Sequence, residues 1–549
     1  MPPTLTYPGV YIEEIPSGVH TIVGVSTSNT AFVDYFAQGP VGVATRLTSW
    51  SDFVRQFGGL DAHSEASYAI QQYYLNGGQV AWVVRVAPGA AAAHADISSG
   101  PAGSGSDSGP TAAPSLTVSA SSPGSWGNNL EVLVQAITGD PARFNLLARL
   151  KAPGAKPNDP PLTIETLRNL SMDPHDPRYA VKVVNDQSTL IVIADPLNPP
   201  DAPTGSSGPL PNPRGWVPLG GNPGSDGAVP PNGDGVPVPG SQWQEAGVQA
   251  LLDVFVPTTP TSPLPLDRIA PDIFNILCIP AAAKLGDQAA TDIYVAALTY
   301  CQAKRAFLVI DPPDGLHITP PHSISEWLDG GLRINSNGAV YYPNLVISDV
   351  QAQLRDRTVG PSGTIAGIYA RTDTNRGVWK APAGVEAVLV GARLPVKLAD
   401  GDIGELNPEG INALRALPII GEVCWGARTL LGADQLASEW KYVPIRRLAL
   451  FLEESLFEST KWVVFEPNDE PLWASIRLNV GAFMHHLFVQ GAFQGQTPRD
   501  AYFVKCDAET TTQADRDLGI VNIVVGFAPL KPAEFVIIQI QQIAGAIPT

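Results

Sequence analysis

The stretch NDEPLWASIRLNVGAFMHHLF, residues 468–488, decides how the C-terminal part of this chain folds. Asn468 or Asp469 is placed to cap a helix, and Pro471 suits its first turn, where no backbone N–H is needed. Apolar residues then recur along one helical stripe at Leu472, Ile476, Val480, Phe483 and Leu487. The pattern predicts a helix over 471–488 that buries one face.

The segments on either side of this helix extend the prediction to a whole domain. Upstream, IRRLALFLEESLFE (445–458) predicts another helix, because Leu448, Leu452 and Leu456 are spaced four apart. Downstream, three strand candidates follow one another: AYFVKCD (501–507), GIVNIVVGFAPL (519–530) and EFVIIQIQQI (534–543). Helices and strands in this order predict an α+β domain.

The last strand candidate is apolar on both faces. Val536, Ile538 and Ile540 alternate to one side, and Phe535 and Ile537 to the other. A soluble protein normally avoids such an edge, so the segment is expected to pair with something, and the sheet of a second copy is one candidate. The alternative is an edge strand added to the sheet of its own chain.

The segment VYIEEI predicts a similar arm near the other end of the chain. It contains Val10, Tyr11 and Ile12, and the preceding Pro8-Gly9 provides a flexible lead. As at the C-terminal end, an added strand within its own sheet is the alternative.

The first 88 residues read as one compact α+β unit. Extended segments occupy residues 7–36, helices are predicted over 49–57 and 64–76, and a buried strand over 79–86. Gly-, Ser- and Pro-rich stretches at 88–114 and 196–240 then flank a small β-rich insert.

From residue 272 the pattern alternates strand, helix and strand, which predicts a partly parallel α/β sheet. The expected fold class is therefore multidomain α+β. Its parts are α+β segments at the two ends of the chain, an α/β middle domain and a small β-rich insert. The expected boundaries are 1–88, 89–245, 246–425 and 426–549.

Composition restricts the function classes. The chain has 549 residues, a net charge of -18 and only 16% charged residues, against about 25% in a typical soluble protein. A surface with few charges suits a protein that buries its exterior against copies of itself. The excess of acidic residues argues against binding to nucleic-acid phosphates.

The four cysteines show no C-x-x-C spacing, which predicts buried, reduced thiols and no zinc site. The first residues, MPPTLTYPGV, have no basic region followed by an apolar one, so no secretory signal is predicted. No apolar run approaches the length of a membrane span. Assembly in the cytoplasm without direct membrane insertion is expected.

No motif in the chain predicts catalysis, a cofactor or a metal. GPSGTIAG (360–367) lacks the Lys-Ser/Thr of a phosphate-binding loop, and 360–384 is expected to be rich in loops around a central helical piece. His485 and His486 are adjacent on the predicted helix and point to different sides, so they cannot chelate one metal ion. The acidic residues Glu453, Glu454 and Glu458 are read as a solvated or partner-contacting helix face.

Several motifs together resemble the tail sheath proteins of contractile phages and contractile injection systems. They are YPGVYIEEIPSG and TAFVDYFAQGPVG near the start, NRGVWK followed by APAG in the middle, and, near the end, WVVFEPNDEPLWASIR, GAFQG, YFVKCD and VGFAPLKPAEFVIIQI. The resemblance covers roughly residues 1–90 and 245–549.

The resemblance implies a structural polymer and no enzyme. It also implies that the N- and C-terminal parts of the chain join as one inner α+β domain, with the α/β middle domain and the β-rich insert further out. In the family, stacked hexameric rings surround an inner tube, terminal arms exchange strands between copies, and contraction drives the tube through a target envelope. The implied partners are further copies of the chain, the inner tube protein, and baseplate and terminal cap proteins. The particle would be a phage tail or a phage tail-like device, with no cofactor.

Four basic residues are candidates to face an acidic tube wall: Arg446, Arg447, Lys461 and Arg477. Ordinary ion pairs within the chain are the alternative for each of them. Two other classes of function remain open at this point. One is an α/β hydrolase or carbohydrate-active enzyme with a β-rich accessory insert, and the other is an adhesin or surface-array protein.

Overall fold

The computed structural model describes residues 20–98, 114–156, 158–195, 211, 215–230, 243–259 and 262–539. The chain forms two compact units. We call residues 28–371 and 382–438 the central unit, and residues 1–27, 372–381 and 439–549 the terminal unit. The predicted mixed α+β class is confirmed by the helices and several sheets that these units contain.

The central unit is built on an eight-stranded sheet in the order β17-β16-β13-β12-β11-β1-β3-β2. Six strands run parallel, and β2 and β17 close the edges in antiparallel fashion. Strands buried on both faces read as continuous apolar runs such as FLVI. The bounds are β1 (Thr30–Asp34), β2 (Thr45–Leu47), β3 (Ala81–Arg85), β11 (Ile276–Cys278), β12 (Phe307–Ile310), β13 (Gly338–Tyr342), β16 (Asn412–Leu417) and β17 (Gly421–Cys424).

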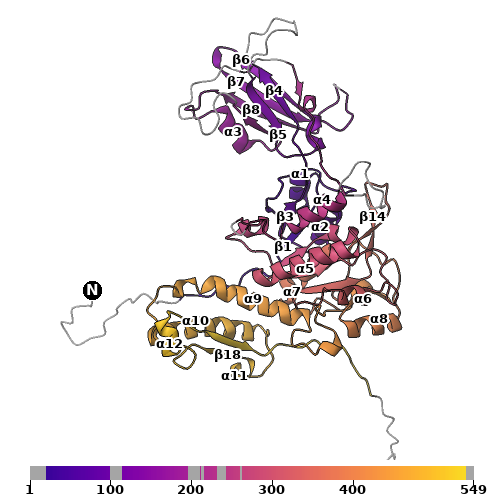
Figure 1. The fold of residues 1–549 in the computed structure, drawn as a ribbon, viewed down its shortest axis with the longest axis vertical. Helices are drawn as coiled ribbons and strands as arrows, with labels where there is room; N and C mark the ends of the chain where they lie inside the picture. Colours follow the sequence, from indigo (N-terminus) through magenta and orange to yellow (C-terminus); the bar gives the residue numbers. More distant parts are fainter. Residues whose placement is uncertain are drawn as a thin grey trace, which may run out of the picture. The chain divides into compact units, whose positions relative to one another are not determined.

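Helices cover both faces of this sheet (Figure 1). Ala31 and Val33 of β1 share a core with α5, whereas Phe32 between them packs edge-on against Tyr73 of α2. On that second face, Tyr369 of α7 meets Phe307 of β12. Outside the insert, the α-helices of the unit are α1 (Trp50–Phe57), α2 (Glu65–Leu75), α4 (Trp243–Leu252), α5 (Asp287–Lys304), α6 (Ile324–Asp329), α8 (Asp400–Leu406) and the first part of α7 (Ser362–Arg376).

The domain boundary expected near residue 88 is not a boundary between these two units. Strands β1 and β3 lie in the first 88 residues, yet β1 pairs with β11 in the parallel sheet of the middle region. Residues 28–88 therefore belong to the central unit, and only residues before 28 belong to the terminal unit. Which unit lies inside or outside an assembly stays a prediction.

The glycines of 360–367 serve helix packing. Helix α7 begins at Ser362 and is longer than the central helical piece expected for 360–384. A Cβ atom at Gly363 would overlap the carbonyl oxygen of Ala69 in α2, and one at Gly367 would lie 2.6 Å from the carbonyl oxygen of Tyr73. The two glycines therefore let α7 cross α2 at close range.

The β-rich insert is part of the central unit and carries its own core. A three-stranded sheet has the order β4-β5-β9 and a four-stranded sheet the order β10-β6-β7-β8, all antiparallel. Leu116, Leu146 and Ile191 lie in the core between them. The elements are β4 (His94–Ser98), β5 (Pro114–Ala120), β6 (Leu130–Ile137), β7 (Asp140–Leu150), β8 (Thr163–Leu170), α3 (Ala180–Gln187), β9 (Ile191–Ala194) and β10 (Val217–Pro218). A hairpin of β14 (Leu345–Asp349) and β15 (Arg355–Val359) completes the central unit.

The terminal unit contains the helix that the sequence predicts most clearly. Helix α10 (Glu470–Val489) is capped by Asp469, whose Oδ1 accepts a hydrogen bond from the Glu470 N–H at 2.8 Å. Its predicted stripe is buried, together with Leu448 and Leu452 of α9 (Val443–Ser459). The unit also holds α11 (Pro498–Ala501), β18 (Tyr502–Lys505), α12 (Gln513–Asp517) and β19 (Val524–Phe527).

Candidate assembly interface

A two-stranded antiparallel sheet in the terminal unit is the first element of the candidate interface. Strands β18 and β19 pair from Tyr502↔Phe527 to Lys505↔Val524. One face rests on the apolar core that α10 contributes to. A two-stranded sheet is marginal by itself, and no third strand joins either edge in the described part of the chain.

The outer face of this sheet carries the apolar residues Phe503 and Val524 beside Lys505. The ring of Phe503 covers the place where a Cβ atom of Gly526 would stand, directly across the strand pair. This arrangement shields a glycine in an exposed strand. Half of Phe503 nevertheless remains exposed to solvent. The sheet thus offers an apolar surface and two open edges to a further strand.

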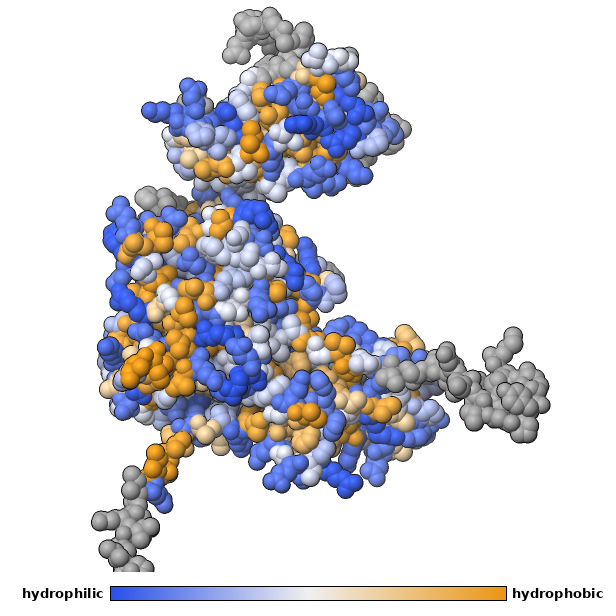
Figure 2. Space-filling model, turned by 180° about the vertical axis from the view of Figure 1, so that it is seen from behind, coloured by the Kyte–Doolittle hydropathy of each residue, from blue (hydrophilic) through white to orange (hydrophobic). Residues whose placement is uncertain are grey.

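The segment that follows β19 is the second element. Phe535, Val536, Ile537 and Ile538 are each between 76% and 84% exposed, and none of them lies in a strand. Figure 2 shows this described end as an apolar run leading to the grey atoms. Its start is tied down by the Tyr442 hydroxyl, which donates to Glu534 Oε2 at 3.3 Å. Val10, Tyr11, Ile12 and Ile540 lie outside the described residues, so their pairing stays a prediction.

Arg447 is not available to a partner. Its side chain is only 4% exposed, and its guanidinium forms two hydrogen bonds to Asp373, at 2.9 and 2.6 Å. A third bond runs to the carbonyl oxygen of Thr27 at 2.8 Å. The prediction that Arg447 faces a tube is therefore wrong, because its charge is used inside the terminal unit.

The other three basic candidates also form ion pairs within the chain. Arg446 pairs with Glu453 at 3.1 Å, Lys461 with Glu458 at 2.5 Å, and Arg477 with Glu470 at 2.5 Å. Lys461 is the most exposed of these cations. These three residues thus form ion pairs within the chain, which is the alternative that the sequence leaves open. A role of Arg446, Lys461 or Arg477 against a tube stays a prediction.

Two buried carboxylates occupy the place where open α/β sheets usually bind ligands. That place is beyond the carboxyl ends of the strands, where the strand order reverses, here between β1 and β11. Asp34, at the end of β1, accepts hydrogen bonds from the N–H groups of Tyr35 and Ala66, both at 2.6 Å. Asp311, after β12, accepts from the N–H and hydroxyl of Ser362, at 2.7 and 2.6 Å.

Each carboxylate thus meets the N-terminus of a helix, α2 for Asp34 and α7 for Asp311, as a bound anion would. Burial raises the pKa of Asp34 well above its ordinary range and that of Asp311 to about 7. The chain's own carboxyl groups therefore occupy the N-termini of two helices at this end of the sheet. This arrangement disfavours the alternative of an α/β hydrolase with its active site here.

The other side chains that could bind a metal ion or take part in catalysis are dispersed or buried. Among the described residues, no three His, Cys, Asp or Glu side chains are placed to hold one metal ion. All four cysteines are buried. His486 contacts Gln490 and His485 lies beside Phe488, so the two rings have different neighbours. No helix in the described ranges is both long and apolar enough to span a bilayer.

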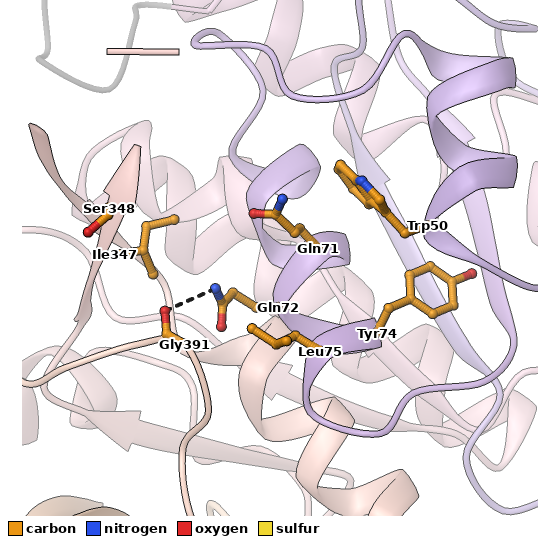
Figure 3. Close-up of a pocket in the computed structure, with 8 residues that line it drawn as sticks. All are labelled: Trp50, Gln71, Gln72, Tyr74, Leu75, Ile347, Ser348 and Gly391. Carbon is orange, nitrogen blue, oxygen red and sulfur yellow. Dashed lines mark hydrogen bonds between the residues drawn. The ribbon is translucent and has the colours of Figure 1, made fainter. Parts of the chain in front are cut away.

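A pocket of about 410 Å³ opens in the central unit beside α2 (Figure 3). Its eight lining residues are uncharged and come from separate stretches of sequence: Trp50, Gln71, Gln72, Tyr74, Leu75, Ile347, Ser348 and Gly391. Gln72 is 4% exposed; its Nε2 donates to Gly391 O at 3.4 Å, while its buried Oε1 has no hydrogen-bond partner in the described structure. Sequence reasoning missed this pocket, because only the tertiary fold brings α1, α2, β14 and Gly391 together.

Comparison with known proteins agrees with these features. Residues 436–543, which span the whole candidate interface, match the family model of the phage tail sheath C-terminal domain. A tail sheath protein of Vibrio phage KVP40 is 28% identical over 198 residues, which are 32% of this chain and 29% of that protein. The match therefore spans less than a third of that relative's own length.

Two solved structures share the fold over nearly the whole chain. The helical sheath of the anti-feeding prophage in its contracted state has a TM-score of 0.55 at 23% identity, covering 98% of this chain and 100% of that one. The sheath complex of the extracellular contractile injection system PVC, also contracted, has a TM-score of 0.55 at 21% identity, covering 99% of both. The predicted resemblance to tail sheath proteins is confirmed.

Proposed function

We propose that this chain is the sheath subunit of a contractile tail or injection device. Copies would polymerise as stacked hexameric rings around an inner tube and contract to drive that tube through a target envelope. The observation that carries the proposal is that one unit contains two incomplete elements. They are the β18–β19 sheet, whose edges are open, and the exposed apolar segment 535–538.

The energetics favour completion by another copy. Burying a large aliphatic or aromatic side chain is worth about 2 kcal/mol, and four such side chains are exposed in succession at 535–538. A strand added to the β18–β19 sheet would cover Phe503 and satisfy main-chain groups at the same time. Assembly through this segment would therefore stabilise a polymer strongly, while a lone copy would leave an aggregation-prone edge.

Strand exchange also provides a mechanism for contraction. Main-chain hydrogen bonds would hold neighbouring copies together while the other surface contacts between them change. Contraction would then be the passage from a metastable lattice to a better-packed one, with the energy stored at assembly and no nucleotide consumed. The two solved sheaths of similar fold that were determined in the contracted state support this reading. The further partners we propose are the inner tube, the baseplate and a terminal cap, with assembly in the cytoplasm.

The test is a charge placed on the apolar segment. The double variant Val536→Asp/Ile538→Asp should leave the monomer folded and abolish tubes in electron micrographs. Leu162→Asp, which changes an exposed apolar residue of the insert, is the matched control and should assemble normally. Full-length tubes from the double variant would contradict the proposal.

A further inference from the structure

The loop between β12 and α6 is fastened to the start of α5 by one histidine. His322 lies just before α6, and its half-exposed ring faces two acceptors. Its Nε2 is 2.7 Å from Oδ2 of Asp287, the first residue of α5. Its Nδ1 is 3.1 Å from the carbonyl oxygen of Gly315 in the same loop. The side chain thus joins the two ends of the segment 315–322 to each other and to the helix.

Both contacts of His322 can form together only when the ring is the imidazolium cation. A carboxylate and a carbonyl oxygen accept hydrogen bonds but have no hydrogen to donate. A neutral imidazole has one N–H group, so it could donate to only one of these acceptors, and its other nitrogen would turn a lone pair toward an oxygen. The geometry therefore calls for a proton on each ring nitrogen.

The charges around the ring favour this cation. Asp287 faces His322 from α5 and Glu326 from α6, and both are acidic. The nearest other ring is that of His317 in the same loop, with the two ring centroids 6.5 Å apart. The hydrogen bond to Asp287, together with the charges of Asp287 and Glu326, raises the pKa of His322 above its ordinary value.

The backbone around His322 holds the ring in this place. His322 has a φ of 66°, a left-handed conformation that histidine adopts more readily than most residues. The His317 N–H donates to the carbonyl oxygen of His322 at 3.0 Å, and the Ile324 N–H donates to that of His317 at 2.9 Å. These two bonds close the loop next to the ring, so their amides report whether the loop is fastened.

The fastened loop covers part of the apolar core. Leu316, which follows Gly315, is only 5% exposed and belongs to the same core as Ile324 of α6. The earlier part of the loop has an attachment of its own, since Asp314 pairs with Lys284 at 2.5 Å. Loss of the two ring contacts would therefore loosen residues 315–323 and leave the start of the loop in place.

We infer that His322 is a pH-operated clip, which fastens residues 315–323 to the N-terminus of α5 when it is protonated and loosens them when it loses the proton. A histidine whose pKa is raised by folding stabilises the folded state fully below the unfolded pKa of about 6.5. That contribution is lost as pH rises through the folded pKa. All the groups involved lie within one copy, so the clip does not depend on the proposed function.

Hydrogen exchange of the dilute full-length chain between about pH 6 and 9 tests the clip. After correction for the intrinsic exchange rate, protection of the His317 and Ile324 amides should fall roughly tenfold across this range, as the loss of one hydrogen bond would give. His322→Asn suits the same backbone conformation and stays neutral, so its protection should be low and independent of pH. His175→Asn, at an exposed histidine of the insert, is the matched control and should keep the wild-type behaviour.

The titration of Asp311 has to be separated from that of His322, because Asp311 precedes the loop and its pKa is raised to about 7. Asp311→Asn should keep the pH dependence of the two loop amides, whereas His322→Asn should remove it. Nitrogen NMR of histidine-labelled protein should also show both ring nitrogens of His322 protonated near pH 6, with a titration above about 6.5. A titration at or below that value, or the wild-type pH dependence of the loop amides in His322→Asn, would overturn this inference.

Discussion

Arg447 and Asp373 form a buried ion pair that joins distant segments of the terminal unit. The carboxylate accepts two hydrogen bonds from one guanidinium, and both side chains are less than 5% exposed. Because Arg447 also bonds the carbonyl of Thr27, helix α9 is tied to the residues before β1 and to the 372–381 piece. The pair thus helps to join the three stretches of chain that form the terminal unit.

Replacing Asp373 should therefore destabilise the unit strongly. Asp373→Ala leaves a buried guanidinium without its counter-charge, and breaking such a pair costs about 3–5 kcal/mol. Chemical denaturation should show this loss in the free energy of unfolding. Lys461→Ala removes an exposed ion pair and is the control, with an expected change below about 1 kcal/mol. Equal effects of the two variants would contradict the account of Arg447.

Asp311 should make stability depend on pH. Its pKa in the folded state is raised to about 7 by burial, above the value of about 3.9 in an unfolded chain. The folded state therefore binds the proton more tightly. The contribution of Asp311 to the free energy of unfolding is fully present below the pKa of the unfolded chain and is lost as pH rises through 7.

Asp311→Asn should flatten this dependence, since the amide stays neutral. Its oxygen can still accept from the Ser362 N–H, and its NH2 group can donate to the Ser362 hydroxyl. We expect the fall in unfolding free energy between pH 4 and 8 to shrink by an amount on the order of 3 kcal/mol. Thermal or urea unfolding across that range measures it. Asp517→Asn, at an exposed position, is the control and should retain the wild-type slope. An Asp311→Asn curve parallel to wild type would show that this carboxyl does not titrate as described.

The close crossing of α2 and α7 predicts an unusual response to alanine. Gly363→Ala places a methyl group against the carbonyl oxygen of Ala69, so the helices must move apart at a cost of about 1–3 kcal/mol. Gly404→Ala in helix α8 meets no atom within 4 Å and should stabilise the protein by about 0.5–1 kcal/mol. Calorimetry of the two variants should show shifts of opposite sign. A stabilising Gly363→Ala would rule out the close crossing.

Arg85 is expected to hold the insert to the sheet. It is completely buried at the end of β3 and donates to the carbonyl oxygens of Phe36 and Gly39, each at 2.6 Å, and of Pro123 in the insert at 2.7 Å. Arg85→Met leaves these acceptors unsatisfied, at about 1–3 kcal/mol each. Limited proteolysis should then cut between the insert and the sheet faster, while Arg168→Met, on the exposed face of β8, should not change the pattern.

Local signals predicted much of the fold. Helix α10 was expected over 471–488 and runs from Glu470 to Val489, because its cap, first-turn proline and apolar stripe all lie within the segment itself. The β-rich insert and the alternating strands and helices after residue 272 could be predicted as well, because their patterns also lie within single segments.

Features that depend on distant contacts were not predictable. The glycines of 360–367 read as a loop, because the helix they pack against lies some 300 residues earlier in the chain. The expected domain of residues 1–88 does not include the pairing of β1 with β11, because that contact also joins segments some 250 residues apart. The sequence leaves two possibilities open for Arg447, a tube-facing position and an ion pair within the chain. Only the position of Asp373, some 70 residues earlier, decides for the buried ion pair.

Backbone hydrogen exchange at residues 535–539 tests the central claim most directly. The amides of this segment are to be compared between dilute monomer and assembled polymer, with those of α10 as an internal reference. Fast exchange in the monomer and slow exchange in the polymer are predicted, because only a neighbouring copy provides the missing strand partner. Slow exchange already in the monomer, unaffected by concentration, would contradict the account.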